Sequence, residues 1–311
     1  MPSALAVVVD GPDAAAWLDR FRGLARGRDI RAWPDALGNV NDIAFACVWR
    51  APHGVLAGFP NLLAIFNLGA GVDHVLADPS LPHVPLGRAV HPDLTMRMTE
   101  YVVLHVLMHH RHQRIYDAQQ RERVWRGHPQ PAAAAVTVGV MGLGVIGAEI
   151  AAVLKRIGFR VAGWSRSERR LPGIACFHGE AGREPFLAQS EILVCVLPST
   201  PETNGILNLG LFRKLNRDGP LGGAYLINAG RGRLQVDADI IAALDEDSLA
   251  GATLDVFPAG SPLWLHPKVT ITPHNAGDLD PAALVADVLA QIDRIERGLP
   301  LEHTVDRCVG Y

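Results

Sequence analysis

The stretch from residue 136 to residue 167 constrains the fold of this chain more than any other feature. An apolar run at 136–141 leads into Gly142-Leu143-Gly144-Val145-Ile146-Gly147, then a helical stretch closed by Gly158, then a second apolar run. This order predicts strand, tight turn, helix and strand. The first glycine permits the turn, the second lets the backbone approach a pyrophosphate, and the third lets the helix pack closely on the strand. The helix N-terminus offers unpaired N–H groups to an anion, so the segment predicts a dinucleotide-binding unit rather than an ordinary turn.

The end of the second strand indicates which dinucleotide is bound. A carboxylate about 20 residues after the glycines would accept hydrogen bonds from the adenosine ribose and repel a 2′-phosphate. The chain instead has Ser165, Arg166 and Ser167 there, with two more arginines just beyond. A guanidinium beside two hydroxyls suits a phosphate, so we expect NADPH to be preferred, with NADH as a second option. The alternative is a solvated basic loop, whose charge Glu168 partly offsets.

Length and composition limit the remaining possibilities. A chain of 311 residues with 49% apolar content can form two domains with buried cores. The net charge is −3 and the basic residues are scattered, which argues against nucleic acid or an anionic membrane as a partner. We find no secretion signal and no run of membrane-spanning length. The four cysteines lack a C-x-x-C spacing and fit a reduced protein, so we expect a cytoplasmic location.

The apolar runs divide the chain into two α/β domains. The strands expected from these runs lie at 5–9, 43–49, 62–66, 136–141, 159–167, 192–197, 224–228, 251–256 and 269–272. A long helical pattern at 95–125 connects the first group to the glycine motif, and a last helix at 281–297 returns to the first domain. We therefore predict a Rossmann domain with a doubly wound parallel sheet at 100–280. A smaller flavodoxin-like α/β domain is expected from 1–99 plus 281–311.

Polar residues follow three strands of the predicted central sheet, at the edge where ligands bind in such folds. Arg231, Asp255 and His274 come at or just after the strands at 224–228, 251–256 and 269–272. An arginine and a histidine beside a nicotinamide suit carbonyl reduction. The guanidinium can hold a carboxylate and polarise the carbonyl, and the imidazole can give a proton to the new hydroxyl. The alternatives are a surface salt bridge for the arginine and a loop role for the histidine, but their joint placement favours catalysis.

With these residues in place, the chain resembles the D-isomer-specific 2-hydroxyacid dehydrogenases over nearly its whole length. The matching segments are Asn67-Leu68-Gly69-Ala70-Gly71-Val72-Asp73-His74, the glycine motif, Leu197-Pro198-Ser199-Thr200-Pro201-Glu202-Thr203, Ile227-Asn228-Ala229-Gly230-Arg231-Gly232, Leu254-Asp255-Val256-Phe257 and Thr272-Pro273-His274. Within the family the chain looks most like the glyoxylate/hydroxypyruvate reductase A group, through Trp164-Ser165-Arg166-Ser167 and Ser261-Pro262-Leu263-Trp264. The resemblance implies a homodimer that reduces glyoxylate or hydroxypyruvate, mainly with NADPH.

The resemblance also implies roles for individual residues. Arg231 would grip the carboxylate and carbonyl of a small 2-oxo acid, and His274 would donate the proton. The implied substrate-binding residues are Trp49, as a wall of the pocket, and Ala70, Gly71 and Val72, whose backbone would form a nest for the carboxylate. The implied cofactor-binding residues are Gly142, Gly144, Val145, Ile146, Gly147, Ser165, Arg166, Ser167, Leu197, Pro198, Thr203, Ala229, Gly230 and Asp255, the last of which would orient the nicotinamide amide. For Trp49, Leu197 and Pro198 plain packing is the alternative.

One segment departs from the family pattern. In the family, a Glu-Pro pair follows the Leu-Asp-Val-Phe segment after two residues, and its glutamate pairs with the catalytic histidine. Here the loop is shorter and Gly260 occupies the expected place. A carboxylate there would hold the imidazole and favour its charged form, so its loss predicts less efficient proton donation. Asp278 or Asp280 could substitute for it.

A group of three histidines is the last candidate site in the sequence. His105, His109 and His112 have helical spacing, but no carboxylate set accompanies them, so we expect no metal site.

The main prediction is an NADP-dependent oxidoreductase that acts on a small-molecule 2-oxo acid. The competing hypothesis, motivated by the missing glutamate, is a catalytically weakened NAD(P)-binding module that responds to redox state.

Overall fold

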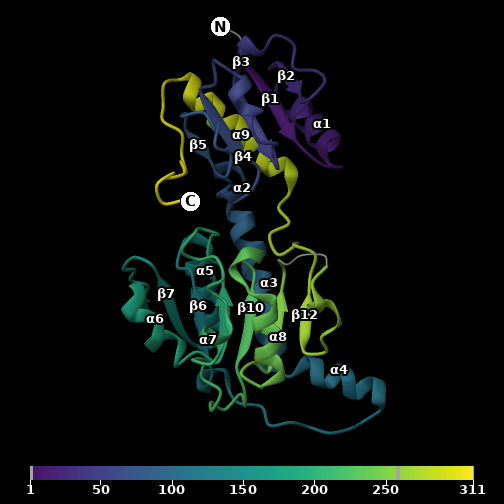
Figure 1. The fold of residues 1–311 in the computed structure, drawn as a ribbon, viewed down its shortest axis with the longest axis vertical. Coiled ribbons are helices and arrows are strands. Elements are labelled where there is room, and N and C mark those ends of the chain that lie inside the picture. Colours follow the sequence, from purple (N-terminus) through teal and green to yellow (C-terminus); the bar gives the residue numbers. More distant parts are fainter. Residues whose placement is uncertain (1–2, 257–259, 311) are drawn as a thin grey trace. The chain divides into compact units, whose positions relative to one another are not determined.

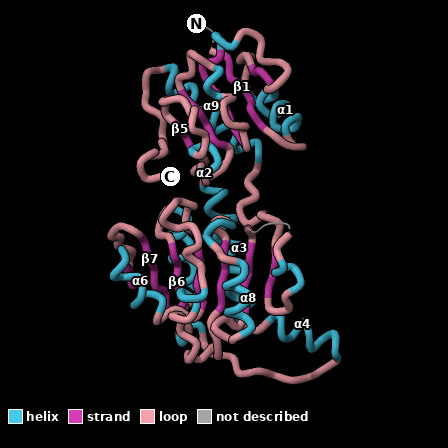
Figure 2. The backbone as a smooth tube through the Cα atoms, viewed as in Figure 1, coloured by secondary structure: helices cyan, strands magenta, loops and turns pink. Residues whose placement is uncertain are grey.

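A computed structural model describes residues 3–256 and 260–310 of the chain. The chain forms two compact units, one made of Met1–Asp93 with Leu279–Tyr311 and the other of Leu94–Asp278 (Figures 1 and 2). These limits lie slightly before the sequence-based domain limits at 99/100 and 280/281. Each unit has its own parallel β-sheet, which confirms the prediction of two α/β folds. None of the helices in the described part of the chain is long and apolar enough to cross a membrane.

The first unit contains a five-stranded sheet in the order β2-β1-β3-β4-β5. Its strands are β1 (Ala4–Val9), β2 (Ile30–Ala32), β3 (Ile43–Trp49), β4 (Ala64–Asn67) and β5 (Leu86–Gly87). Its helices are α1 (Ala14–Leu24), α2 (Asp73–Leu76) and α9 (Pro281–Glu296), with short 3₁₀ turns at Val40–Asp42 and Leu56–Gly58. All neighbouring strands are parallel, and all six residues of β1 are buried. This strand order is that of flavodoxin-like sheets, as predicted.

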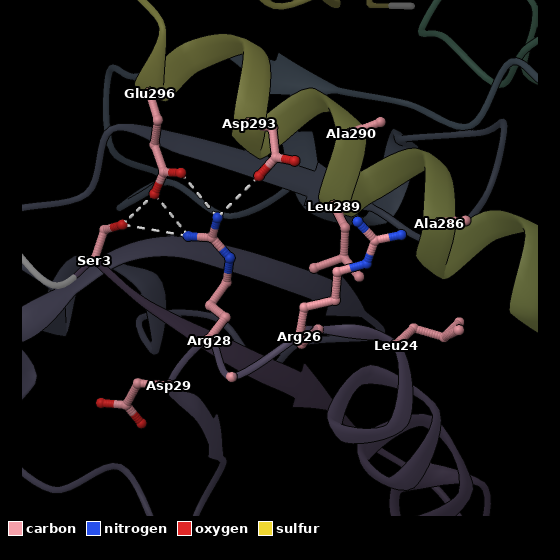
Figure 3. Close-up of a pocket in the computed structure, with 12 residues that line it drawn as sticks. Ser3, Leu24, Arg26, Arg28, Asp29, Ala286, Leu289, Ala290, Asp293 and Glu296 are labelled. Atoms are coloured by element: carbon pink, nitrogen blue, oxygen red, sulfur yellow. Dashed lines mark hydrogen bonds and ion pairs between the residues drawn. The ribbon is translucent and has the colours of Figure 1, made fainter.

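Helix α9 brings the end of the chain back to the first unit. The Asp280 side chain caps its start by accepting a hydrogen bond from the Ala282 amide at 3.0 Å. Near its end, the guanidinium of Arg28 reaches Glu296 at 2.7 Å and Asp293 at 3.1 Å (Figure 3). These contacts border an open hollow of about 720 Å³ between α9 and the turn after α1. The ion pairs fasten the returning helix to the loop that precedes β2.

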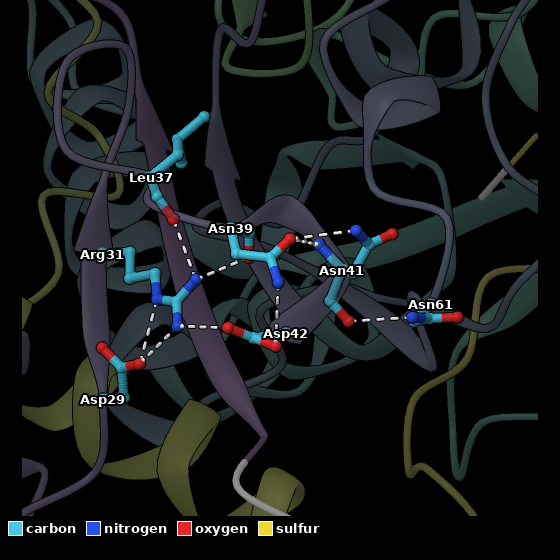
Figure 4. A network of polar contacts seen from close by, with 7 residues as sticks. All are labelled: Asp29, Arg31, Leu37, Asn39, Asn41, Asp42 and Asn61. Atoms are coloured by element: carbon cyan, nitrogen blue, oxygen red, sulfur yellow. Dashed lines mark hydrogen bonds and ion pairs between the residues drawn. The ribbon is translucent and has the colours of Figure 1, made fainter.

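A second polar network supports the edge strand β2. The guanidinium of Arg31 reaches the Asp29 carboxylate at 2.8 Å and the Asp42 carboxylate at 3.1 Å (Figure 4). It also donates hydrogen bonds to the carbonyls of Leu37, at 2.9 Å, and Asn39, at 2.7 Å. The loop after β2 is therefore organised around one cation. This explains how a strand of three residues without a buried apolar run keeps its place.

The second unit contains a seven-stranded parallel sheet in the order β12-β11-β10-β9-β6-β7-β8. Its strands are β6 (Thr137–Met141), β7 (Arg160–Ser165), β8 (Ala175–His178), β9 (Ile192–Cys195), β10 (Tyr225–Asn228), β11 (Gly251–Leu254) and β12 (Val269–Ile271). Its helices are α3 (Pro92–His110), α4 (Gln113–Glu122), α5 (Val145–Ile157), α6 (Gly179–Leu187), α7 (Leu209–Phe212) and α8 (Asp237–Asp245), with 3₁₀ turns at Ala133–Ala135, Gly232–Leu234 and Pro262–Leu265. The order reverses between β6 and β9, which is where doubly wound sheets bind ligands.

The prediction of a single helix at 95–125 is wrong. The structure divides this stretch into α3 and α4, because His112 adopts a left-handed backbone with φ of 55° that an α-helix cannot continue through. Helix α4 then extends away from the rest of its unit (Figure 1). The loop that follows carries Trp125, which is 100% exposed. A 2.7 Å hydrogen bond between Gln119 and His128 joins this loop to α4.

Candidate active site

The glycine motif forms the turn between β6 and α5. Gly142 has φ of +113°, a conformation that L side chains rarely adopt. A Cβ on Gly147 would lie 1.7 Å from the Gly142 carbonyl oxygen, so only glycine lets the helix approach the turn this closely. Gly144 is the N-cap of α5, and because glycine has no side chain, no capping hydrogen bond occupies the start of the helix. The first N–H groups of this 13-residue helix are therefore directed toward a turn that can receive a phosphate.

The surface around this turn leaves room for a dinucleotide. A Cβ on Gly144 would meet no heavy atom within 4 Å, and Gly144 and Val145 are both exposed. Ile146 is half-buried. These are the features that an extended pyrophosphate against a helix N-terminus requires, so the residues present fit the predicted cofactor.

The end of β7 has hydroxyl groups and a guanidinium in place of a carboxylate. The buried Ser165 hydroxyl donates a 2.8 Å hydrogen bond to the Ser167 carbonyl, which shapes this loop. A hydrogen bond from Thr200 is the main cause that lowers the pKa of Glu202, and the positive charge of the exposed Arg166 adds a smaller contribution. Glu168 forms an ion pair with Arg170 at 2.9 Å. The carboxylate expected to offset the basic loop is therefore engaged by a neighbouring arginine.

The loop after β9 packs tightly against the glycine turn. A Cβ on Gly142 would lie 3.1 Å from the backbone of Val196, and Leu197 is buried. The Thr203 hydroxyl donates to the Pro198 carbonyl at 2.7 Å and accepts from the Thr200 amide at 2.8 Å. Thr203 therefore stabilises this loop through hydrogen bonds within it, independently of any contact with the cofactor.

Asn228, at the end of β10, organises the turn that carries Arg231. Its Oδ1 accepts from the Gly230 amide at 3.1 Å, and its Nδ2 donates to the Arg231 carbonyl at 3.2 Å and to Gln235 Oε1 at 2.9 Å. Asn228 is fully buried, Ala229 is buried and Arg231 is half-buried. The sequence analysis did not single out Asn228. A buried amide at the end of a strand that precedes a functional turn was the available signal.

Asp255, just after β11, holds the segment that carries His274. The carboxylate is 2% exposed and accepts hydrogen bonds from the Thr272 hydroxyl at 2.6 Å, the Asn275 amide at 3.0 Å and the Ala276 amide at 3.1 Å. His274 lies between these anchors, is exposed, and has φ of 58°. Its amide donates to the Thr272 carbonyl at 3.0 Å. Asp255 thus has a clear role in shaping this turn, in addition to the proposed contact with the nicotinamide.

The segment that departs from the family pattern is partly described. Residues 257–259 lie outside the described residues, whereas Gly260 is exposed and a Cβ there would meet no heavy atom within 4 Å. Of the two carboxylates considered as substitutes, Asp280 is engaged as the cap of α9. Asp278 is exposed.

In the first unit, the predicted substrate-binding residues lie at the carboxyl ends of β3 and β4. The half-buried Trp49 ring packs edge-on against His74, with ring centroids 5.4 Å apart. A Cβ on Gly69 would lie 2.5 Å from the Trp49 ring. Ala70 and Gly71 are half-buried and Val72 is 1% exposed. Asn67 Nδ2 donates to the Gly69 carbonyl at 2.8 Å and the Gly71 carbonyl at 3.0 Å. Asn67, like Asn228, is a supporting residue to which the sequence analysis assigned no role.

The structure therefore places the predicted site residues of each unit at one edge of its own sheet. In the second unit, the glycine turn, Arg231 and His274 follow β6, β10 and β12. The three histidines considered as metal ligands lie elsewhere: His105 and His109 are buried in α3 and His112 precedes α4. Within the described ranges, no group of three or more potential ligands is placed to hold a metal ion.

Comparison with known proteins identifies the family. The model of the NAD-binding domain of the D-isomer-specific 2-hydroxyacid dehydrogenases matches residues 103–276. A relative from Escherichia fergusonii, named glyoxylate/hydroxypyruvate reductase A, is 39% identical over 310 aligned positions that cover 96% of this chain and 97% of the relative. The chain belongs to this family.

Solved structures of D-isomer-specific 2-hydroxyacid dehydrogenases match this dehydrogenase along its whole length. An NADPH-dependent glyoxylate/hydroxypyruvate reductase from Sinorhizobium meliloti, solved with NADP and sulfate, is 43% identical with a TM-score of 0.93, covering 99% of this chain and 100% of that one. A family member from Xanthobacter autotrophicus Py2, solved with NADPH and MES, is 39% identical with a TM-score of 0.93 and full coverage of both chains. The predicted family and fold class are thereby confirmed.

Proposed function

We propose that this dehydrogenase reduces glyoxylate and hydroxypyruvate to the corresponding 2-hydroxy acids with NADPH. The oxidoreductase class follows from membership of the family. The substrates and the cofactor are supported by relatives that carry these names and by structural neighbours solved with NADP or NADPH. The observation that carries the proposal is the presence of Arg231 and His274 after strands of the sheet that also holds the glycine turn.

Residues of the second unit would hold the cofactor. The N-terminus of α5 and the glycine turn would bind the pyrophosphate, and Ser165, Arg166 and Ser167 would bind the 2′-phosphate. The loops after β9 and β10 would line the rest of the groove through Leu197, Pro198, Thr203, Ala229 and Gly230. When bound, NADPH supplies the hydride for the carbonyl carbon.

The remaining chemistry belongs to side chains of the protein. Arg231 would bind the substrate carboxylate with its planar guanidinium and polarise the carbonyl oxygen, on which negative charge develops. His274 would donate a proton to that oxygen as the hydroxyl forms. In the first unit, the backbone of Ala70, Gly71 and Val72 would form a nest for a carboxylate, and the Trp49 ring would limit the size of the substrate.

The competing hypothesis of a weakened binding module is less well supported. It was motivated by the missing glutamate, yet relatives matched over 96% of the chain are named as reductases. A steady-state assay of the purified protein with NADPH and each 2-oxo acid separates the two hypotheses. We expect oxidation of NADPH that depends on glyoxylate or hydroxypyruvate. A protein that binds NADPH tightly but oxidises none in the presence of either acid would contradict the proposal.

We also propose that the enzyme is a cytoplasmic homodimer. The arm formed by α4 and its loop exposes Ile115, Val124 and Trp125, apolar side chains that a second subunit could cover. The cysteines in the described part of the chain are all free, which suits a reducing compartment. Light scattering during size-exclusion chromatography tests the oligomeric state: Trp125→Ser should shift a dimer toward monomers, and a wild-type protein of monomeric mass would exclude the dimer.

A further inference from the structure

The turn that carries His274 is fastened on both sides by one carboxylate. Asp255 accepts from Thr272, two residues before His274, and from Asn275 and Ala276, which directly follow it. Between these anchors His274 has φ of 58°. A residue with a side chain is stable in this left-handed region only where its surroundings hold it there. The position of the imidazole therefore depends on how firmly Asp255 is itself held.

Helix α3 contributes a second layer to this arrangement. The Tyr101 hydroxyl lies 2.7 Å from the Thr272 hydroxyl. The Thr272 hydroxyl has one proton, which it donates to Asp255, so Tyr101 must be the donor in its bond to Thr272. The hydrogen bonds thus run in one direction, from Tyr101 through Thr272 to Asp255.

The surroundings of Tyr101 keep it in this role. Burial raises the pKa of Tyr101 above its ordinary value, so its hydroxyl keeps its proton and can donate it near neutral pH. Its ring packs against His105 with ring centroids 4.3 Å apart. Burial lowers the pKa of His105, so the histidine packs there as a neutral ring near neutral pH.

We propose that Tyr101 is a positioning residue for the reaction, whose hydroxyl orients Thr272 and, through Asp255, holds the turn that presents His274. This inference rests on the proposed role of His274 as the proton donor. Tyr101 does not contact the reacting atoms. It determines how well the imidazole is placed, so it should affect the rate of the chemical step more than the binding of either NADPH or substrate.

The test is Tyr101→Phe, which removes one hydroxyl and keeps the ring. We expect kcat with glyoxylate to fall about tenfold or more, because misplacement of a catalytic group is costly. The dissociation constant of NADPH, measured by fluorescence, should stay within about twofold of wild type, because the glycine turn after β6 and the end of β7, which are proposed to bind its phosphates, lie outside this network. The KM of glyoxylate should stay within the same limit, because Arg231, which is proposed to bind the substrate carboxylate, also lies outside it.

Tyr225→Phe is the matched control. Tyr225 is also partly buried and packs against a histidine of α3, with its ring 4.7 Å from that of His109. It opens β10, at the other end of the strand from Arg231. Among the described residues its hydroxyl has no hydrogen-bond partner, so the same chemical change there should leave kcat unaltered. Equal losses of kcat in the two tyrosine variants would overturn the inference.

Two variants of Thr272 test the direction of the network and keep the inference testable if Tyr101→Phe folds poorly. Thr272→Val removes the hydroxyl and should lower kcat as Tyr101→Phe does, with no further loss when the two are combined. Thr272→Ser keeps the hydroxyl and should retain most of the wild-type kcat. Equal loss in the Ser and Val variants, or losses that add in the double variant, would contradict a shared network.

A final variant separates this inference from the proposed function. His274→Asn removes the proton donor, and asparagine tolerates the left-handed backbone. If His274→Asn keeps its turnover, the proposed catalytic role of His274 fails and the inference fails with it. If His274→Asn loses turnover while Tyr101→Phe behaves like Tyr225→Phe, the proposed function stands and only the role of Tyr101 is wrong.

Discussion

Asn228 and Arg231 are joined across one turn: the buried amide of Asn228 donates a 3.2 Å hydrogen bond to the carbonyl oxygen of Arg231. The same side chain also bonds Gly230 and Gln235, so all of its polar atoms are used. The catalytic arginine proposed here is therefore placed by a residue that does not itself face a ligand. The guanidinium of Arg231 also donates a 2.8 Å hydrogen bond to the Gly230 carbonyl, which holds the arginine side chain over the turn.

Asn228→Asp should damage both stability and catalysis. The carboxylate would still accept from Gly230, but it could no longer donate to Arg231 or Gln235. We expect a loss of about 1–3 kcal/mol in the free energy of unfolding from the unmatched buried groups. We also expect kcat/KM to fall at least about tenfold as the turn shifts. Thermal unfolding and steady-state kinetics measure both. Asn61→Asp, at an exposed asparagine that bonds the Asn41 carbonyl, is the control and should change neither.

Arg166→Ala should alter cofactor choice. Removing one charge-assisted contact to the 2′-phosphate should weaken NADPH binding by on the order of 1.5–3 kcal/mol. The KM for NADH, which lacks that phosphate, should change little. Arg170→Ala is a suitable control because Arg170 is exposed and paired with Glu168. If the KM values for NADPH and NADH rise equally in Arg166→Ala, the arginine does not read the phosphate.

Arg231→Lys should separate binding from turnover. Lysine keeps the positive charge but loses the planar pair of donors that suits a carboxylate. NADPH binding measured by fluorescence should persist while most of the turnover is lost. Arg233→Lys, two residues away at an exposed position, should be silent. Wild-type turnover in Arg231→Lys would remove this residue from the proposed site.

The ion pair between Arg28 and Glu296 should make the first unit sensitive to acid. The hydrogen bond from Arg28 lowers the pKa of Glu296 from 4.5 to about 2. Because the folded pKa lies below the unfolded one, the stabilisation is complete above about pH 4.5 and disappears as the pH falls toward 2. Glu296→Gln should therefore lower the Tm at neutral pH, and the difference from wild type should shrink over that interval.

Glu184→Gln provides the comparison for the acid experiment. Glu184 pairs with Lys214 at 3.0 Å, but both side chains are largely exposed, so solvent screens the pair. Its replacement should leave the Tm nearly unchanged at every pH. A constant difference in Tm between wild type and Glu296→Gln from neutral pH down to pH 2 would show that this carboxylate does not act through its charge.

Long apolar runs were sufficient to predict most of the two sheets, since β3, β6, β9 and β10 are buried on both faces. The strands β2, β5 and β8 were not predicted, because they are edge strands of two to four residues. Polar contacts such as those of Arg31 hold β2, and these depend on residues that meet only after folding. The division between α3 and α4 was hidden for a similar reason: a single left-handed residue, His112, leaves the helical pattern of the sequence intact.

Motifs in the sequence identified the residues that are expected to contact ligands, but they did not identify the residues that support them. Gly142, Arg231 and His274 follow predicted strands at fixed offsets. Asn67 and Asn228 share no spacing with them, and their role becomes visible only when donors and acceptors are paired in space. Tyr101 is separated from Thr272 by 171 positions in the sequence, so no local pattern could connect the two.

The crowding at Gly147 has a consequence for how cofactor use can diverge. The space between α5 and the glycine turn is too narrow at Gly147 for even a methyl group, so this position of the proposed pyrophosphate site has almost no freedom to vary. Arg166, at the end of β7, is exposed to solvent. In the proposed binding mode, affinity for dinucleotides in general and discrimination between them therefore depend on separate places, one fixed by packing at Gly147 and one open to substitution at Arg166. Descendants of this enzyme could exchange one nicotinamide coenzyme for the other at the surface while the packing at Gly147 stays the same.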